Sequence, residues 1–397
     1  INQEDIKSID ILKDASAAVY GSRAGNGVVL VTTKRGQIGK PKISYSGQFG
    51  YADEISRPKM LSAYDYGKIW NGVRTANPSS TWDPHLDLFQ ADELEDMRNL
   101  NYDLLEDEWS AAFTQKHSIN MGGGTENANY FAGLSYYTQD GNIGNLDYER
   151  WNYRAGVDLK INKWLKASMQ VSGNYGEDTK AYNGVAATTG LEADYNRLLT
   201  QPRYIPSSIN GLPIASYGIT NDEEHSSQLY NYSAIQNSGD YKKNMNQEMT
   251  INTSLEYDFG WNQYLKGLKL KFSYAKSINT NKSNQLGTSY TLYKMVNRGG
   301  SGYHLYTGDL SEGNFSPSII NNGGMVDRTM YRTDNYQMNF MATYQRTFGN
   351  HDISGLFGIE KSEREFEDLY GSRSDLYPNA NGQSSTTGND ATKKDNR

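Results

Sequence analysis

Aromatic and imidazole side chains gather in two stretches whose composition suits carbohydrate binding. A flat aromatic face stacks on the apolar face of a sugar ring, and polar neighbours reach the hydroxyl groups of the sugar. Packing within a loop, or contact with a partner protein, uses the same residue types, and we expect it to be the commoner role of any single one. The candidate contacts to a ligand or partner are Trp82 and His85 in the first stretch and Tyr303, His304 and Tyr306 in the second.

Acidic residues are dense in the segment between these stretches, at Asp92–Asp96 and Glu106–Glu108. Two carboxyl groups can form the acid and base of a glycosidase, and several can bind calcium. Acids this close in sequence are more typical of the solvated face of a helix, and we prefer that interpretation, with one or two surface helices between residues 57 and 112. We therefore predict no catalytic residues and no enzyme activity.

Composition excludes several classes of protein. There is no cysteine, and the five histidines show no metal-ligand spacing, so we expect no metal and no cofactor. A net charge of −7 argues against nucleic acid as a partner. The mean hydropathy of −0.76 is low for a membrane protein, yet 31 tyrosines and 39 glycines are many for a soluble domain. A transmembrane β-barrel reconciles these values, because only every second strand residue faces lipid.

Apolar and polar residues alternate in runs of the length that a tilted membrane strand requires. With a hairpin near residues 115–144 and a last strand from Ile353 to Phe366, we count about nine strands. The clearest runs are residues 43–51, 153–161, 165–175, 251–257, 268–274 and 336–344.

The connections between these runs are sorted by length. The links at 122–127, 162–164 and 348–352 are tight, and the link at 258–267 is moderately short. Short turns on one side of a sheet and long loops on the other are typical of outer-membrane barrels, with the short turns periplasmic. We predict long extracellular loops near residues 52–113, 178–243, 279–331 and 367–397. The link at 139–149 lies on the same side of the sheet but is a modest exception in length.

The first residues predict a strand, a helix and a second strand. The strands are Ile9–Lys13 and Val28–Lys34, and Asp14 caps a helix over Ala15–Tyr20 that Gly21 ends. Such a unit is too small to bury its own apolar surface, so it belongs to something larger. Since the chain begins at Ile1 with no signal peptide and has no apolar run that could form a membrane helix, we expect a piece of a longer polypeptide.

Residues 6–36 resemble the signature region of the SusC/RagA family of TonB-dependent outer-membrane transporters, where it closes the plug domain. The stretch 115–144, with its glycine-rich turn and its Gln-Asp-Gly element, is similar to an early barrel hairpin of the same family. Together the two regions cover about a quarter of the chain. The residues that carry the plug signature are Lys13, Asp14, Ala15, Ser16, Tyr20, Gly21, Ser22, Arg23, Asn26, Gly27 and Lys34.

This resemblance implies an all-β fold, a fragment of a plugged transmembrane antiparallel barrel. Residues 1–38 would end the plug, and residues 39–397 would form the N-terminal part of the barrel. It implies import of oligosaccharides across the outer membrane of a Gram-negative bacterium, with a SusD-like surface lipoprotein as partner and energy from the TonB complex. TonB would grip a segment that precedes residue 1. The alternatives are a peptide importer of the RagA type, or a passive porin or surface adhesin; a soluble β enzyme acting on carbohydrate is less consistent with the sorted loops.

Two basic residues close the second strand of the plug unit, Lys34 and Arg35. A buried cation requires a carboxylate partner, which lumen-facing strand positions such as Asp158 or Glu256 can provide. We therefore predict an ion pair between the plug and the barrel wall at this place.

Overall fold

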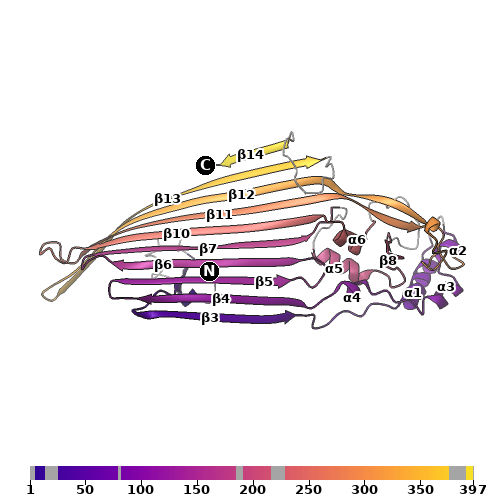
Figure 1. The fold of residues 1–397 in the computed structure, drawn as a ribbon, viewed down its shortest axis with the longest axis horizontal. Coiled ribbons are helices and arrows are strands. Elements are labelled where there is room, and N and C mark those ends of the chain that lie inside the picture. The colour runs from indigo at the N-terminus through magenta and orange to yellow at the C-terminus, as the bar shows by residue number, and fades with distance from the viewer. Residues whose placement is uncertain are drawn as a thin grey trace.

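A ten-stranded antiparallel sheet forms most of the chain (Figure 1). The computed structural model describes residues 5–13, 26–78, 82–184, 191–215, 229–374 and 390–396. Each strand pairs with its neighbours in chain order, from β3 at one edge to β14 at the other. The strands are β3 (Gly39–Ala52), β4 (Ala112–Gly124), β5 (Ala128–Asp140), β6 (Asp147–Lys160), β7 (Leu165–Ala181), β10 (Tyr241–Asp258), β11 (Leu268–Met295), β12 (Phe315–Phe348), β13 (His351–Ser374) and β14 (Asp390–Asn396).

The two ends of this sheet differ, as the connection lengths predict. One end, which we call the turn end, carries the links 125–127, 161–164, 259–267 and 349–350. The other, the loop end, carries the long connections and all six α-helices of the described residues (Figure 1), with a short 3-10 helix at Glu312–Asn314. The helices are α1 (Ala63–Ala76), α2 (Pro84–Asp87), α3 (Ala91–Asp96), α4 (Leu104–Glu108), α5 (Leu191–Thr200) and α6 (Tyr232–Asn237), with two short strands β8 (Ser208–Ile209) and β9 (Leu212–Pro213) among them.

Several strands are longer than the apolar alternation predicts. The expected loop at 279–331 is wrong at both margins, because β11 continues to Met295 and β12 begins at Phe315. The expected loop at 367–397 also contains the end of β13 and all of β14, so the sheet has ten strands instead of about nine. Backbone hydrogen bonds between strands need no apolar side chain, so pairing continues into polar sequence where the alternation has ended.

The N-terminal hairpin consists of β1 (Ile6–Leu12) and β2 (Val28–Thr33), which pair antiparallel. Both predicted strands are therefore confirmed. Gly27 precedes β2 with φ of +93°, a conformation that glycine adopts without steric cost. The predicted helix and most of the signature residues, Asp14 to Arg23, lie outside the described residues; Lys13, Asn26, Gly27 and Lys34 lie within them.

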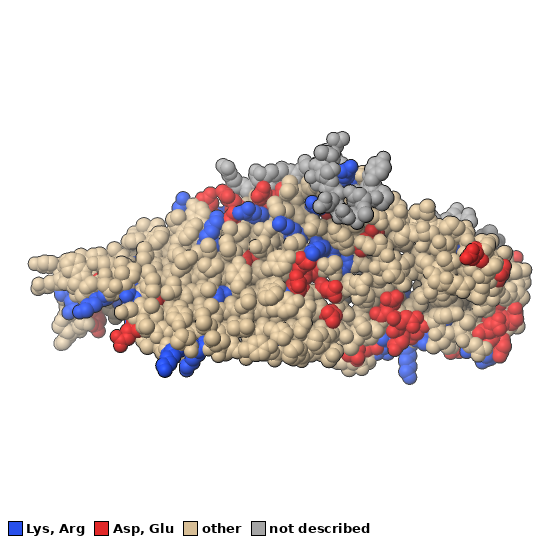
Figure 2. Space-filling model, in the orientation of Figure 1, with Lys and Arg blue, Asp and Glu red and all other residues tan. Residues whose placement is uncertain are grey.

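The tightly buried apolar residues lie mainly at the loop end, where the long connections pack on one another. The largest cluster joins Ala63 of α1, Tyr204, and Leu305 and Tyr306 of the connection between β11 and β12. No helix in the described residues is long and apolar enough to cross a membrane. Acidic side chains gather at the loop end of the face drawn in Figure 2, and several of those in the helical connections are ion-paired, such as Glu106 with Arg57.

Candidate functional site

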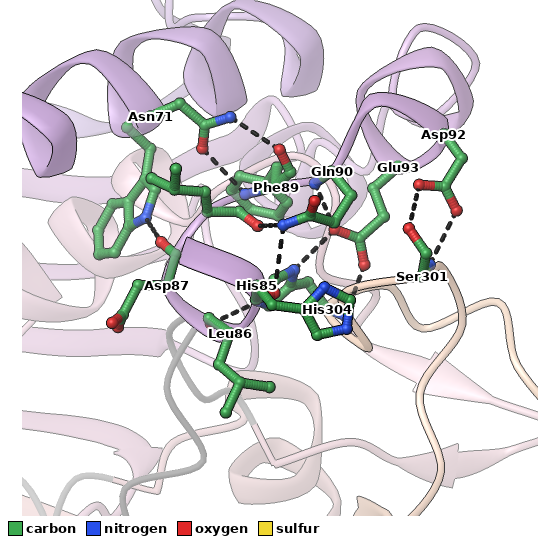
Figure 3. A network of polar contacts seen from close by, with 12 residues as sticks. Asn71, His85, Leu86, Asp87, Phe89, Gln90, Asp92, Glu93, Ser301 and His304 are labelled. Carbon is green, nitrogen blue, oxygen red and sulfur yellow. Dashed lines mark hydrogen bonds and ion pairs between the residues drawn. The ribbon is translucent and has the colours of Figure 1, made fainter. Parts of the chain in front are cut away.

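The two stretches of candidate ligand contacts meet at the loop end, although they are more than 200 residues apart in sequence. Residues 84–96 and 298–306 contact each other there, and we call this contact the loop junction (Figure 3). Helix α1 positions the first of these segments. The Trp70 Nε1–H donates to the carbonyl of Asp87, and the Asn71 side chain forms two hydrogen bonds with the backbone of Phe89.

A buried carboxylate and a buried imidazole lie at the centre of the loop junction. Glu93 is completely buried, and His304 is 2% exposed. Glu93 Oε1 accepts from the backbone N–H of His304 at 2.9 Å, and Oε2 lies 2.7 Å from His304 Nδ1. The carbonyl of Leu86, 2.8 Å from Nε2, can only accept, so Nε2 carries a hydrogen. The expectation that the acids at 92–96 form a solvated face is therefore wrong for Glu93, because His304 of a distant loop covers it and donates to it.

Glycines allow the second segment to wrap closely around Glu93. A Cβ added to Gly300, where φ is +84°, would overlap the Glu93 side chain. A Cβ on Gly302 would lie 2.7 Å from Glu93 Oε2. Tyr303 then adopts a positive φ of 61°, which is rare and strained for a residue with a side chain. The loop thus directs His304 inward and leaves Tyr303 60% exposed.

A second acidic contact closes the rim of the junction. Asp92 accepts hydrogen bonds from the backbone N–H and the hydroxyl of Ser301. These bonds, with that of the hydroxyl the larger influence, lower the pKa of the Asp92 carboxyl below its usual value. The carboxylate therefore remains charged and continues to accept both bonds at neutral pH.

The structure separates the predicted contact residues into two groups. His304 and Tyr306 are buried, so they hold the loops together and do not present a surface to a ligand. His85 and Tyr303 are exposed and lie edge to face, with 6.5 Å between ring centroids. Trp82 is partly buried. The described residues contain no group of three or more side chains suited to a metal ion.

A second site joins the N-terminal hairpin to the sheet. Arg35 Nη1 lies 2.5 Å from Asp158 Oδ1 of β6, so the predicted ion pair between the N-terminal hairpin and the sheet is present, although the Arg35 side chain is half exposed and not buried as expected. Glu256, the other predicted carboxylate, pairs instead with Lys166 of β7. Four residues before Asp158, on the same face of β6, Arg154 Nη2 donates to the Thr33 hydroxyl at 2.6 Å. Arg154 was not among the predicted residues. Period-two alternation places it on the same face of β6 as Asp158, which could have indicated a contact with the hairpin.

Reversing the charge of Arg35 is expected to loosen the hairpin. Arg35→Glu places a carboxylate against Asp158, and since the Arg35 side chain is 48% exposed, we expect only a severalfold faster proteolysis of residues 26–38. Limited proteolysis with mass spectrometry measures this rate. Lys34→Glu is the control of equal charge change, and the exchange Arg35→Asp with Asp158→Arg should restore resistance. Unchanged cleavage in Arg35→Glu would count against a role of the pair in holding the hairpin.

Comparison with known proteins supports the predicted family. No family model matches the sequence. TonB-dependent receptor P26 of Formosa agariphila is 32% identical over 203 residues, which cover 49% of this chain and 20% of that receptor. TonB-dependent receptor SusC of Bacteroides thetaiotaomicron is 29% identical over 202 residues, covering 50% of the chain and 18% of SusC. Over about half of its length, this chain is similar in sequence to TonB-dependent receptors, SusC among them, and it spans about a fifth of their length.

Solved structures show the same fold. The RagAB peptide importer in its closed-closed state aligns with the whole of this chain at a TM-score of 0.68, with 21% sequence identity. The RagAB peptide transporter aligns at 0.67, with 20% identity. In both, the chain covers 43% of the RagAB chain. The predicted fold class, all-β with a large antiparallel sheet, is confirmed, whereas the assignment of residues 1–38 to the end of a plug stays a prediction.

Proposed function

We propose that the protein containing this chain imports a nutrient across the outer membrane by TonB-dependent transport. The observation that carries the proposal is the hairpin bound to one face of a sheet whose short turns lie at one end and whose helical loops lie at the other (Figure 1). A passive pore or an adhesin has no need of such a hairpin. Sequence similarity to TonB-dependent receptors points the same way.

The difference between the two ends of the sheet, short turns at one and long loops at the other, supports one orientation in the outer membrane of a Gram-negative bacterium. Short turns face the periplasm in such barrels, which places the loop end outside the cell. A SusD-like lipoprotein would then contact the loop end, where the loop junction lies. TonB would act from the periplasmic side, on a part of the protein outside this chain.

Oligosaccharides are the ligand class that we propose first. The exposed rings of His85 and Tyr303 stand at the rim of the loop junction, and strained backbone at Tyr303 is a feature that clusters at binding sites. An aromatic face next to polar groups suits a sugar ring. Peptides are the alternative, since the structurally similar RagAB is named a peptide importer.

Removing the two exposed rings is expected to reduce uptake. In cells that carry the intact protein, His85→Ala with Tyr303→Gly should lower uptake of labelled oligosaccharides at limiting concentration about fivefold, since a stacked aromatic pair contributes on the order of 1 kcal/mol. Glycine is chosen because it accepts the positive φ at position 303. The matched control is Tyr264→Ala, an 86% exposed ring at the turn end.

Two results would overturn parts of this proposal. Uptake that continues unchanged after deletion of TonB would exclude energised import and favour a passive pore. Uptake of labelled peptides, with none of oligosaccharides, would replace the proposed ligand class by the alternative while leaving import in place.

A further inference from the structure

A cavity of about 630 Å³ lies between the N-terminal hairpin and the strands β3 to β6. Its floor is formed by β-strand positions such as Asn120, Phe131 and Gly133, and its rim by the segment 32–40 that leads from the hairpin into the sheet. Pockets that bind small molecules commonly have volumes of about 300–1,000 Å³. Neither the ion pair of Arg35 nor the loop junction accounts for this space.

The lining of the cavity is strongly basic. Six of the lining residues carry positive charge, whereas Asp5 is the one lining residue with a negative charge. The whole chain has a net charge of −7, so the positive charge of the cavity lining is opposite in sign to the net charge of the chain. The positive residues are Lys7, Lys34, Arg35, Lys40, Lys42 and Arg154.

Arg154 is the most enclosed of these cations. It is 6% exposed, and its guanidinium lies over the Phe131 ring at 4.1 Å from the ring centroid. One nitrogen, Nη2, donates to Thr33, but the buried Nε has no hydrogen-bond acceptor among the described residues. A buried donor without an acceptor costs about 1–3 kcal/mol, more when it is charged, so an acceptor that enters the cavity would relieve this cost.

We propose that this cavity binds a carboxylate-bearing oligomer, with Arg154 as the principal cation and Lys40 and Lys42 at the mouth. Guanidinium groups prefer carboxylates because two parallel N–H donors match two oxygens. A short acidic oligosaccharide and a short acidic peptide share this chemistry. Binding itself is independent of the proposed function, whereas the position of the site on an import route rests on it.

Calorimetry on the purified intact protein tests the proposal, with trigalacturonate and triglutamate as acidic probes and maltotriose as the neutral one. At least one acidic probe should bind, and salt should weaken that binding because the lysines are exposed. Arg154→Gln should weaken it about tenfold to a hundredfold, the usual effect of losing a hydrogen bond to a charged group. The probe that binds identifies the source of the carboxylate.

Two further variants separate binding from packing. Lys40→Gln with Lys42→Gln changes only exposed side chains and should weaken the same probe, without altering proteolysis of the hairpin. Arg328→Gln, an exposed arginine of β12 outside the cavity, should have no effect. The proposal is overturned if maltotriose binds as tightly as the acidic probes, if neither acidic probe binds, or if Arg154→Gln loosens the hairpin but leaves affinity unchanged. Uptake that persists in cells with Arg154→Gln would leave the import function standing.

Discussion

Replacing Glu93 by alanine is expected to open the loop junction. The substitution leaves His304 and the backbone N–H of Gln90 buried without their acceptor. A buried donor left without its acceptor typically costs about 1–3 kcal/mol, and Glu93 accepts from more than one donor. Since the junction is one local part of the molecule, the loss should appear as local opening while the sheet remains intact.

Hydrogen exchange at the backbone amides of Gly299 and Leu305 measures this opening. Each of these residues donates to the carbonyl of the other, so their protection reports closure of the second segment. We expect protection to fall about a hundredfold or more in Glu93→Ala, in line with the cost of the donors left without their acceptor.

The matched control for this experiment is Glu95→Ala in the same helix. Its carboxylate is 73% exposed and pairs with Arg98. Exposed pairs of this kind contribute about 0–1 kcal/mol, so protection should hardly change. Equal loss of protection in the two variants would show that the stability of α3, and not the buried pair, decides whether the junction closes.

Sequence alone predicted those contacts that depend on local pattern. Period-two alternation placed Asp158 on the face opposite Val157, so Asp158 could be named, together with Glu256, as a possible partner of the basic residues that follow β2. The sorted turns predicted the two ends of the sheet for the same reason: each link depends only on the strands that flank it.

The rest depends on which distant segments meet. Trp82 and His85 on one loop, and Tyr303 and His304 on another, were predicted as separate candidates, and no local pattern brings them together. Nor does a run of acids reveal that Glu93 alone turns inward, because its partner His304 lies 211 residues away. Strand ends were missed because pairing by backbone hydrogen bonds leaves no signature in polar sequence.

A second buried carboxylate holds the extended part of the sheet at the loop end. Asp240, just before β10, accepts from the backbone N–H and the hydroxyl of Thr288, at the irregularity where β11 shifts register. It also accepts from Asn322 of β12, which in turn donates to the carbonyl of Tyr182. One side chain therefore joins three strands where their regular ladder is interrupted.

Asp240→Ala is expected to separate β11 from β12 beyond this point. It leaves donors of Thr288 and Asn322 buried and unsatisfied, at about 1–3 kcal/mol each, so amide protection in residues 289–295 should fall about a hundredfold. Residues 268–278, in the turn-end half of β11, should keep their protection. Asp352→Ala, which removes an exposed acceptor of Thr347 at the turn end, is the control. If both halves of β11 lost protection equally, the sheet would open as one unit and Asp240 would have no local role. The helical loops are built on these extended strands. Selective loss of protection in residues 289–295 would therefore show that the loop end is stabilised separately from the rest of the sheet.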